Sequence, residues 1–365
     1  MPTRNPFADP DVRVPTDGPF SAQEVVLANR NHGIALEMLR HDVTPAGLHY
    51  LLNHFDIPYV AEAQSWRLDV GGLVDRPLSL SLAELQALPH KTLRVTLECA
   101  GNGRGHFTPR WPSMPWMSEA VGTSEWTGTP LRAVLERAGL KAGVADVAFH
   151  GIDSGFDRSH EHHYARSLKP ELALADDVLL VWAMNGQPLL PQHGFPLRLI
   201  VPGWYGMASV KWLARIEAVD QPFQGHQQVG TYHFRTKPDE QGVPITHMRV
   251  KSLIVPPGIP DWYSRKRLVD AGPVTIYGRA WSGGGTPITE VEVSVNGVWR
   301  PAVLDAPAGP FAWRGWRFNW QATPGGYDFA CRATDAAGNV QPLESAYDRG
   351  GFGNNAVHRI EVFVR

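Results

Sequence analysis

Short apolar runs separated by glycine and proline turns fill the last third of the chain and restrict its fold more than any other feature. Five such runs are rich in β-branched and aromatic residues: 274–278, 288–295, 298–303, 313–320 and 327–334. Asn296-Gly297 stands between two of them, and Asn-Gly between alternating strands is the strongest short hairpin signal. Regular short strands without a Cys–Trp–Cys pattern predict an immunoglobulin-like β-sandwich that has no disulfide.

The residues before about 245 follow a mixed α+β pattern. Ser21 with Glu24 and Ser81 with Glu84 have the spacing of capping boxes, and Thr129 with Gly139 is expected to start and stop a third helix. Strands are expected at 66–70, 93–99, 146–150, 178–182, 197–201 and 210–216. We therefore expect an N-terminal extension (1–40), an α+β domain (41–245) and a β-sandwich domain (246–365), with a linker near 256–258.

Composition excludes several classes of protein. The 34 basic and 36 acidic residues give a net charge of −2, which argues against a nucleic-acid binder. The two cysteines, Cys99 and Cys331, rule out a disulfide framework and an all-cysteine zinc site. No apolar run is long enough for a membrane span, and the first residues do not resemble a leader. These features predict a cytoplasmic protein, or a periplasmic one if a leader has been removed.

The strand at 93–99 delivers Cys99 to a glycine-rich loop. Gly101, Gly103 and Gly105 allow close backbone access, and the positive charge of Arg104 favours the thiolate, which is the form that binds metals. The spacing is not that of a dinucleotide fingerprint, and the prolines at 109, 112 and 115 forbid the helix that should follow. From these residues alone, a glycine-rich turn beside a buried thiol remains the alternative.

Two further segments carry polar clusters. Ser159-His160-Glu161-His162-His163-Tyr164 lacks the second histidine of a zinc-protease motif and is expected to be a solvated loop. His193, Arg198 and Lys211 lie near successive loop ends and suit an anionic ligand, although each alone could pair with a surface carboxylate. Neither a Gly-x-Ser-x-Gly elbow nor a Walker A sequence is present.

In this order the segments resemble the sulfite oxidase family of molybdopterin enzymes, in its bacterial haem-free form. The most specific matches are Cys99–Arg104, 119–131 with Trp126-Thr127-Gly128, and 184–212. The C-terminal part, with Trp281-Ser282-Gly283 and the Asn296-Gly297 turn, looks like that family's dimerisation domain. The resemblance implies a molybdopterin-binding α+β domain followed by an immunoglobulin-like domain.

The resemblance also implies roles for single residues. Cys99 matches the protein ligand of molybdenum, Arg104 an oxyanion-holding arginine, Trp116 a pocket tryptophan and Tyr232 the active-site tyrosine. Arg349, aligned across a one-residue gap, matches an arginine that reaches the pocket from the second domain. The residues that match the molybdopterin-binding positions are Asn53, His54, Asp153, His193, Arg198, Ser209 and Lys211, together with Cys99.

The implied reaction is oxidation of sulfite to sulfate by oxygen-atom transfer in a homodimer. No Cys-x-x-Cys-His site attaches a haem, so electrons are expected to pass to a separate acceptor such as a cytochrome. Leu52 stands where the family usually has arginine, and either another cation such as Arg166 compensates or the substrate is not a simple oxyanion. The alternatives are reductive chemistry on nitrate or a sulfoxide, and a cofactor-free β-rich binding protein.

Overall fold

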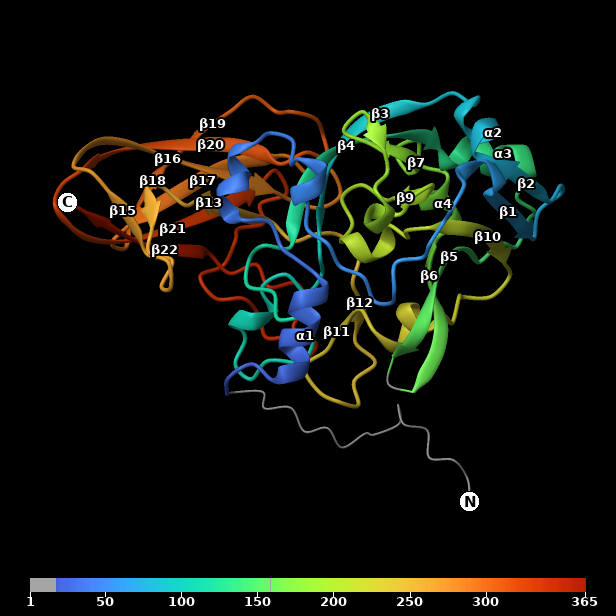
Figure 1. Cartoon of the computed structure of the whole chain (residues 1–365), viewed down its shortest axis with the longest axis horizontal. Helices are drawn as coiled ribbons and strands as arrows, with labels where there is room; N and C mark the ends of the chain where they lie inside the picture. The colour runs from blue at the N-terminus through green and yellow to red at the C-terminus, as the bar shows by residue number, and fades with distance from the viewer. Residues whose placement is uncertain (1–17, 158) are drawn as a thin grey trace, which may run out of the picture.

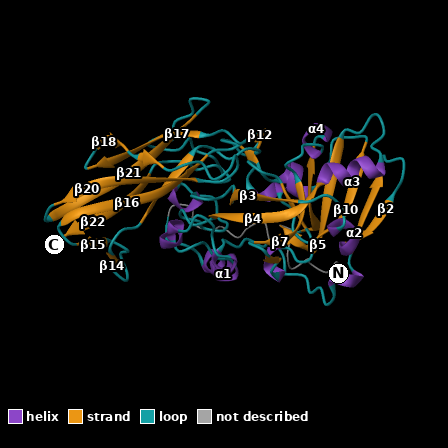
Figure 2. Cartoon of the chain, turned by 90° about the horizontal axis from the view of Figure 1, so that it is seen from above, coloured by secondary structure: helices purple, strands orange, loops and turns teal. Residues whose placement is uncertain are grey.

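A computed structural model describes residues 18–157 and 159–365, which form two sheet-rich bodies placed side by side (Figure 1). The C-terminal strands make up one body and the two N-terminal sheets the other, while the early segment 36–40 packs on the C-terminal strands. Strands dominate both bodies, and the helices lie mainly around the N-terminal sheets (Figure 2). Within the described residues, no helix has the length and apolar character needed to cross a membrane.

Two sheets organise the N-terminal region. The first has the order β2-β1-β10-β5-β6, and the second has the order β3-β4-β7-β8 with β9 paired to β7. The strands of the first sheet are Leu78–Ser81, Arg67–Gly72, Leu213–Val219, Asp146–Asp157 and His160–Leu168. Those of the second are Lys91–Glu98, Val121–Pro130, Leu179–Met184, Gln187–Pro188 and, for β9, Arg198–Ile200. A hydrophobic core packs the first sheet against helix α3 and the segment 197–201.

The helices are short and begin where local capping allows. Helix α1 (Ala22–Arg30) and helix α2 (Leu82–Gln86) both start at the expected capping boxes, with Ser21 paired to Glu24 and Ser81 paired to Glu84. The other α-helices are α3 (Leu131–Ala138) and α4 (Pro170–Ala173). Short 3-10 helices cover Leu36–Arg40, Ala46–Leu48, Ala63–Ser65, Arg104–His106, Pro191–His193 and Gly206–Ala208, and a π-helix covers His226–Gly230.

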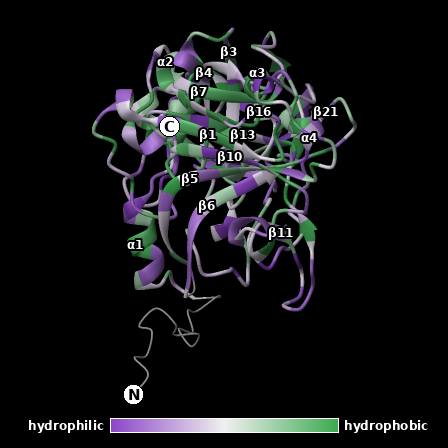
Figure 3. Cartoon of the chain, turned by 90° about the vertical axis from the view of Figure 1, so that its right-hand side faces the viewer, coloured by the Kyte–Doolittle hydropathy of each residue, from purple (hydrophilic) through white to green (hydrophobic). Residues whose placement is uncertain are grey.

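Two local expectations about the N-terminal region are wrong. Thr129 does not cap α3, because it belongs to β4 and its hydroxyl donates to the Pro89 carbonyl (2.8 Å); Pro130 takes the cap position instead. The histidine-rich segment after residue 159 is not a loop but the start of β6, because it pairs with the end of β5. This part of β6 is hydrophilic (Figure 3), which is why the sequence resembles a solvated loop.

The C-terminal strands form two facing sheets that enclose their own core. One sheet has the order β13-β16-β20-β19 and the other β14-β15-β22-β21-β17-β18. Their bounds are, from β13 to β22, Lys251–Val255, Ile259–Pro260, Arg267–Val269, Gly272–Trp281, Ile288–Val295, Val298–Pro301, Val303–Leu304, Arg314–Ala322, Gly325–Asp335 and His358–Val364. The predicted hairpin is confirmed, because Val295 pairs with Val298 and both Asn296 and Gly297 have positive φ.

The expected linker at 256–258 lies inside this body, because β13 before it is already paired with β16. A two-stranded hairpin of β11 (His233–Phe234) and β12 (Val243–Pro244) precedes β13. A third hydrophobic cluster joins the two bodies and includes Ala100 and Val121 from one side and Leu253 and Trp281 from the other. The loop after β3 therefore lies at the junction of the two bodies.

Candidate active site

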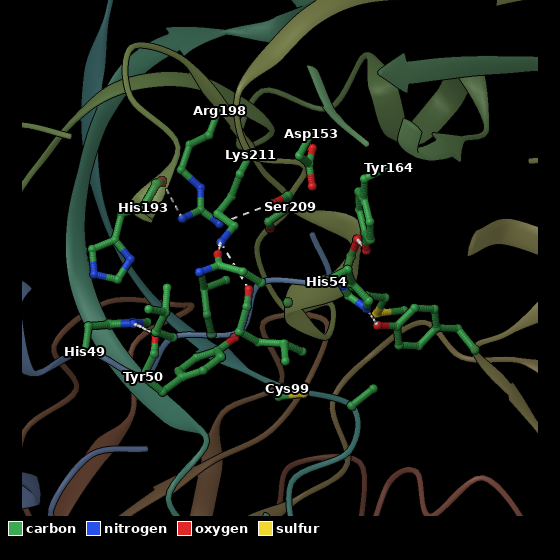
Figure 4. Close-up of a pocket in the computed structure, with 18 residues that line it drawn as sticks. His49, Tyr50, His54, Cys99, Asp153, Tyr164, His193, Arg198, Ser209 and Lys211 are labelled. Carbon is green, nitrogen blue, oxygen red and sulfur yellow. Dashed lines mark hydrogen bonds between the residues drawn. The ribbon is translucent and has the colours of Figure 1, made fainter. Parts of the chain in front are cut away.

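Cys99 directly follows β3 and lies at one side of a pocket in the N-terminal region (Figure 4). Its amide donates to the Ala120 carbonyl (2.9 Å), which fixes the backbone at the end of the strand. Burial raises the pKa of the Cys99 thiol, although the charge of Arg104 and the indole of Trp116 act in the opposite direction. Arg104 therefore favours the thiolate, as expected, but burial has the larger effect on this pKa.

The glycines after Cys99 make room for protein groups. A Cβ on Gly101 would lie 2.7 Å from Nη1 of Arg104, and a Cβ on Gly103 would lie 2.7 Å from the Cβ of Asn354. Arg104 is buried, and its Nη1 donates to the Met114 carbonyl (3.0 Å). The loop thus holds an arginine side chain against its own backbone, beside the thiol.

Trp116 belongs to a small cluster that also contains Cys99. Its Nε1–H is buried and makes no hydrogen bond of normal geometry within the described residues, although it lies near enough to lower the pKa of the Cys99 thiol. An indole N–H that is buried without an acceptor is available to a group bound beside Cys99.

The opposite side of the pocket carries Arg198, Lys211 and Ser209 (Figure 4). Arg198 donates to the carbonyls of His193 (3.0 Å) and Ser209 (3.2 Å), and its Nε has no partner in the described part of the chain. The Lys211 ammonium donates to the Leu52 carbonyl (3.0 Å) and to the side chain of Asn53. Burial, with the neighbouring charge of Arg198, lowers the pKa of Lys211 well below its ordinary value.

These cations lack carboxylate partners. Among residues 18–157 and 159–365, neither Arg198 nor Lys211 makes an ion pair, and the same is true of Arg104 and Arg166. Unpaired buried charges are costly, so a cluster of them favours binding of an anion. His193 is not part of the charge, because burial and the nearby His49 and Arg198 lower its pKa to about 2.

A tyrosine and a histidine meet between the two sides of the pocket. The Tyr232 hydroxyl lies 2.9 Å from Nε2 of His54, in hydrogen-bonding contact. Tyr232 has a φ of +47°, a conformation that is uncommon outside glycine and tends to occur at functional sites. Arg166 lies with its guanidinium carbon 5.5 Å from the centre of the Tyr232 ring.

The structure brings most of the predicted site residues together. The pocket is lined by Asn53, His54, Cys99, Asp153, His193, Arg198, Ser209, Lys211 and Tyr232. Arg104 and Trp116 lie behind Cys99, whereas Arg349 stacks over Trp111 (4.5 Å) and does not line this pocket. The role of Arg349 stays a prediction.

Sequence reasoning did not identify several pocket residues. His49, Tyr50 and Tyr164 line the pocket but were not singled out. Tyr164 and Arg166 are two residues apart in β6 and both are buried, so they lie on the same face of the strand. That spacing in the sequence is the signal that could have identified Tyr164. Leu52 also lines the pocket. Arg166, the cation expected to compensate for it, is buried with its guanidinium carbon 5.5 Å from the centre of the Tyr232 ring.

The burial of Asp153 predicts how the stability of the cofactor-free chain depends on pH. Burial raises its pKa from 3.8 to about 6, and its Oδ1 has no partner in the described structure. The neutral form is thus favoured in the folded state, so its stabilisation is complete below pH 4 and is lost as pH rises through about 6. We expect the unfolding free energy of the cofactor-free chain to lose about 2 kcal/mol from this group between pH 4 and 7.

Urea unfolding of wild type and Asp153→Asn across that pH range measures this loss. Asp153→Asn should remove this part of the pH dependence, whereas Asp177→Asn, at a largely exposed surface carboxylate, should not change it. An equal pH slope in wild type and Asp153→Asn would show that Asp153 ionises freely in the folded chain.

Comparison with known proteins shows which family this chain belongs to. Residues 54–227 match the family model "Oxidoreductase molybdopterin binding domain", and residues 243–365 match "Mo-co oxidoreductase dimerisation domain". Human mitochondrial sulfite oxidase is 33% identical over 99% of this chain and 68% of its own length. The chain belongs to the sulfite oxidase family. It is therefore a molybdopterin-dependent oxidoreductase.

Other members of the family differ in their named activities. Nitrate reductase [NADH] 2 of Phaseolus vulgaris is 30% identical over 97% of this chain but only 42% of its own length. The sulfane dehydrogenase SoxCD from Paracoccus pantotrophus has a similar fold, with a TM-score of 0.76, 26% identity and coverage of 98% of this chain and 94% of that one. The family assignment therefore fixes the cofactor more closely than the substrate.

The pocket residues fit molybdenum–molybdopterin. Arg198 and Lys211 supply positive charge and make no ion pair within the described residues, which suits the phosphate of the cofactor. The unpartnered Asp153 Oδ1 and His49 Nε2 suit the polar edges of a pterin ring. The buried Cys99 thiol is a soft sulfur donor of the kind that suits such a metal.

Proposed function

We propose that this chain oxidises a sulfur donor by oxygen-atom transfer, with sulfite as the first candidate substrate. The observation that supports the proposal best is a buried thiol facing a set of buried cations that have no carboxylate partner. When bound, molybdenum–molybdopterin supplies the oxygen-atom transfer and takes up two electrons. The overall reaction is sulfite plus water giving sulfate, two protons and two electrons, which pass to an external acceptor such as a cytochrome.

The chain's own residues hold, orient and charge the site. We assign Cys99 as the metal ligand, and we assign the pocket cations and polar residues given above to the molybdopterin. Arg104 and Arg166 favour an anionic substrate beside Cys99, and Tyr232, held by His54, places a hydroxyl toward it. Trp116 offers an unpartnered N–H at the same place. The buried surroundings exclude water, which strengthens each of these interactions.

The C-terminal body is proposed to be an immunoglobulin-like dimerisation domain. Its two facing sheets and its match to a dimerisation-domain model support that role. We propose domain limits of 41–245 for the molybdopterin-binding domain and 246–365 for the dimerisation domain. Two copies of the chain would then each carry one complete pocket.

A second candidate substrate is a sulfane-sulfur donor. Leu52 lines the pocket at the position where the resemblance leads us to expect arginine. This substitution reduces the positive charge that a small dianion such as sulfite prefers. The similarity to a sulfane dehydrogenase supports the same alternative.

Steady-state reduction of ferricyanide by the molybdenum-loaded enzyme distinguishes these substrates. If sulfite is the substrate, its kcat/KM exceeds that of thiosulfate, and nitrate is not reduced by reduced viologen. Leu52→Arg should then raise kcat/KM for sulfite about tenfold or more, because a charge-assisted hydrogen bond contributes about 1.5–3 kcal/mol. Leu52→Met, which keeps the size without the charge, is the matched control.

Other outcomes point elsewhere. Faster turnover of thiosulfate than of sulfite in wild type would favour the sulfane-sulfur donor. Viologen-dependent nitrate reduction faster than sulfite oxidation would replace the proposal with reductive chemistry. Less than about 0.1 molybdenum per chain after expression with molybdate would support a cofactor-free binding protein.

A further inference from the structure

A buried ion pair links the residue before Cys99 to the C-terminal body. Glu98 ends β3, and Lys251 begins β13. The Lys251 Nζ lies 2.9 Å from Oε1 of Glu98, and their side chains are 4% and 2% exposed. These two residues are 153 positions apart in the chain, so only the packing of the two bodies brings them together.

Both members of this pair make further hydrogen bonds. Lys251 also donates to the carbonyl of Asn354 (2.8 Å), next to the segment that packs on the glycine loop. Glu98 accepts from the Trp281 indole at Oε2 (2.9 Å) and from the Asn102 amide at Oε1 (3.0 Å). The network therefore holds the residues on both sides of Cys99, one before it and one three positions after it.

The same C-terminal body makes further contacts with this loop. Three hydrogen bonds run from the Gly353 amide to the Ala100 carbonyl (2.8 Å), from the Asn354 Nδ2 to the Gly103 carbonyl (3.0 Å) and from the Arg104 Nε to the Gly350 carbonyl (2.9 Å). The loop after β3 has no regular strand pairing of its own beyond Glu98. Hydrogen bonds to Met114, Trp116 and Ala120 of the N-terminal region hold one side of this loop, and the contacts with the second body hold the other.

A buried ion pair is weak evidence for stability alone, because the cost of removing two charges from water offsets their attraction. It is, however, strongly directional, and it fails when either partner moves. A single protein ligand to a metal needs such fixed support, because small displacements of a ligand reduce activity. These properties are those expected of a contact that holds Cys99 in position.

We propose that Lys251 is a positioning residue for Cys99, acting across the junction of the two bodies through Glu98. The inference rests on the proposed role of Cys99 as metal ligand, but the placement of the thiol can be measured without the metal. In this arrangement the C-terminal body does more than associate with a second copy. It completes the loop that presents the ligand.

Alkylation of the cofactor-free protein by N-ethylmaleimide, resolved by peptide mass spectrometry, tests the placement. In Lys251→Met, Cys99 should react about tenfold faster than in wild type, the lower end of what the loss of a supporting contact costs at metal sites. Cys331 is fully buried in the C-terminal core and serves as an internal reference for global unfolding. Its rate should stay unchanged.

Arg267→Met is the matched control. Arg267 is also a 4% exposed cation of the C-terminal body that pairs with a carboxylate of the N-terminal region, Glu37 (3.0 Å), but it does not contact the Cys99 loop. It should leave the Cys99 rate within about twofold of wild type, since additivity holds for distant sites. If Lys251→Met also exposes Cys331, the double variant Glu98→Gln/Lys251→Met replaces it in the test, because it leaves neither charge of the pair without a partner. The double variant should show the same faster alkylation of Cys99.

The loaded enzyme gives a second measurement. Lys251→Met should lower kcat about tenfold while KM stays within about twofold, because the cations that bind substrate are untouched. Equal Cys99 labelling in wild type and the Lys251 variants, or equal acceleration in Arg267→Met, would overturn the proposal. Failure of the metal-ligand assignment would appear separately, as sulfite oxidation that persists in Cys99→Ser while the labelling result stands. Failure of the proposed function would appear as a molybdenum-loaded wild type that oxidises neither sulfite nor thiosulfate.

Discussion

Cys99→Ser is expected to abolish sulfite-dependent reduction of ferricyanide, by at least about 100-fold, because loss of a supporting residue alone costs metal sites 10–100-fold. Serine keeps the size of the side chain but replaces a soft sulfur with a hard, weakly acidic oxygen, which high-valent molybdenum with sulfur ligands accepts poorly. The hydrogen bond from the Cys99 amide to the Ala120 carbonyl does not depend on the side chain. The fold should therefore persist.

Turnover, molybdenum content and the thermal midpoint should be measured together for this variant. Cys331→Ser is the control, because Cys331 is a buried core thiol of β21 whose pKa is raised by burial to about 12. It should lower the thermal midpoint and leave kcat intact. Sulfite oxidation retained by Cys99→Ser with a native midpoint would remove the metal-ligand assignment.

Lys211→Met is expected to reduce molybdenum retained after gel filtration to about a tenth of wild type or less, as befits the loss of a charge-assisted contact of 1.5–3 kcal/mol. Lys211 is buried, stacks on Trp212 (4.3 Å) and has no carboxylate partner in the described structure. In the cofactor-free chain, losing a desolvated charge offsets losing its hydrogen bonds. The unfolding free energy should then change by less than about 1.5 kcal/mol.

Metal analysis and urea unfolding of the same preparations separate these two effects. Lys91→Met is the control, since Lys91 lies on β3 but pairs with the surface carboxylate of Asp177 (2.7 Å). It should keep its molybdenum. A Lys211→Met enzyme with full molybdenum content would show that the phosphate of the cofactor is held elsewhere.

Short-range chemistry determined what the sequence could predict by itself. The capping boxes at Ser21 and Ser81 and the hairpin at Asn296-Gly297 were predictable because their hydrogen bonds and φ values involve residues at most three positions apart. The alternation of 93–99 placed Cys99 at the end of a strand for the same reason. The family resemblance then supplied candidates for the pocket, which no local pattern could have gathered.

Tertiary structure decided the features that depend on distant partners. Thr129 is a residue type that often caps helices, but its hydroxyl donates to the distant Pro89 carbonyl. The histidine-rich segment forms a strand only because it pairs with β5. Burial raises the pKa of the Cys99 thiol, although the neighbouring Arg104 lowers it. The pair of Glu98 with Lys251 has no signature in sequence, because the two residues lie 153 positions apart and meet only when the two bodies pack together.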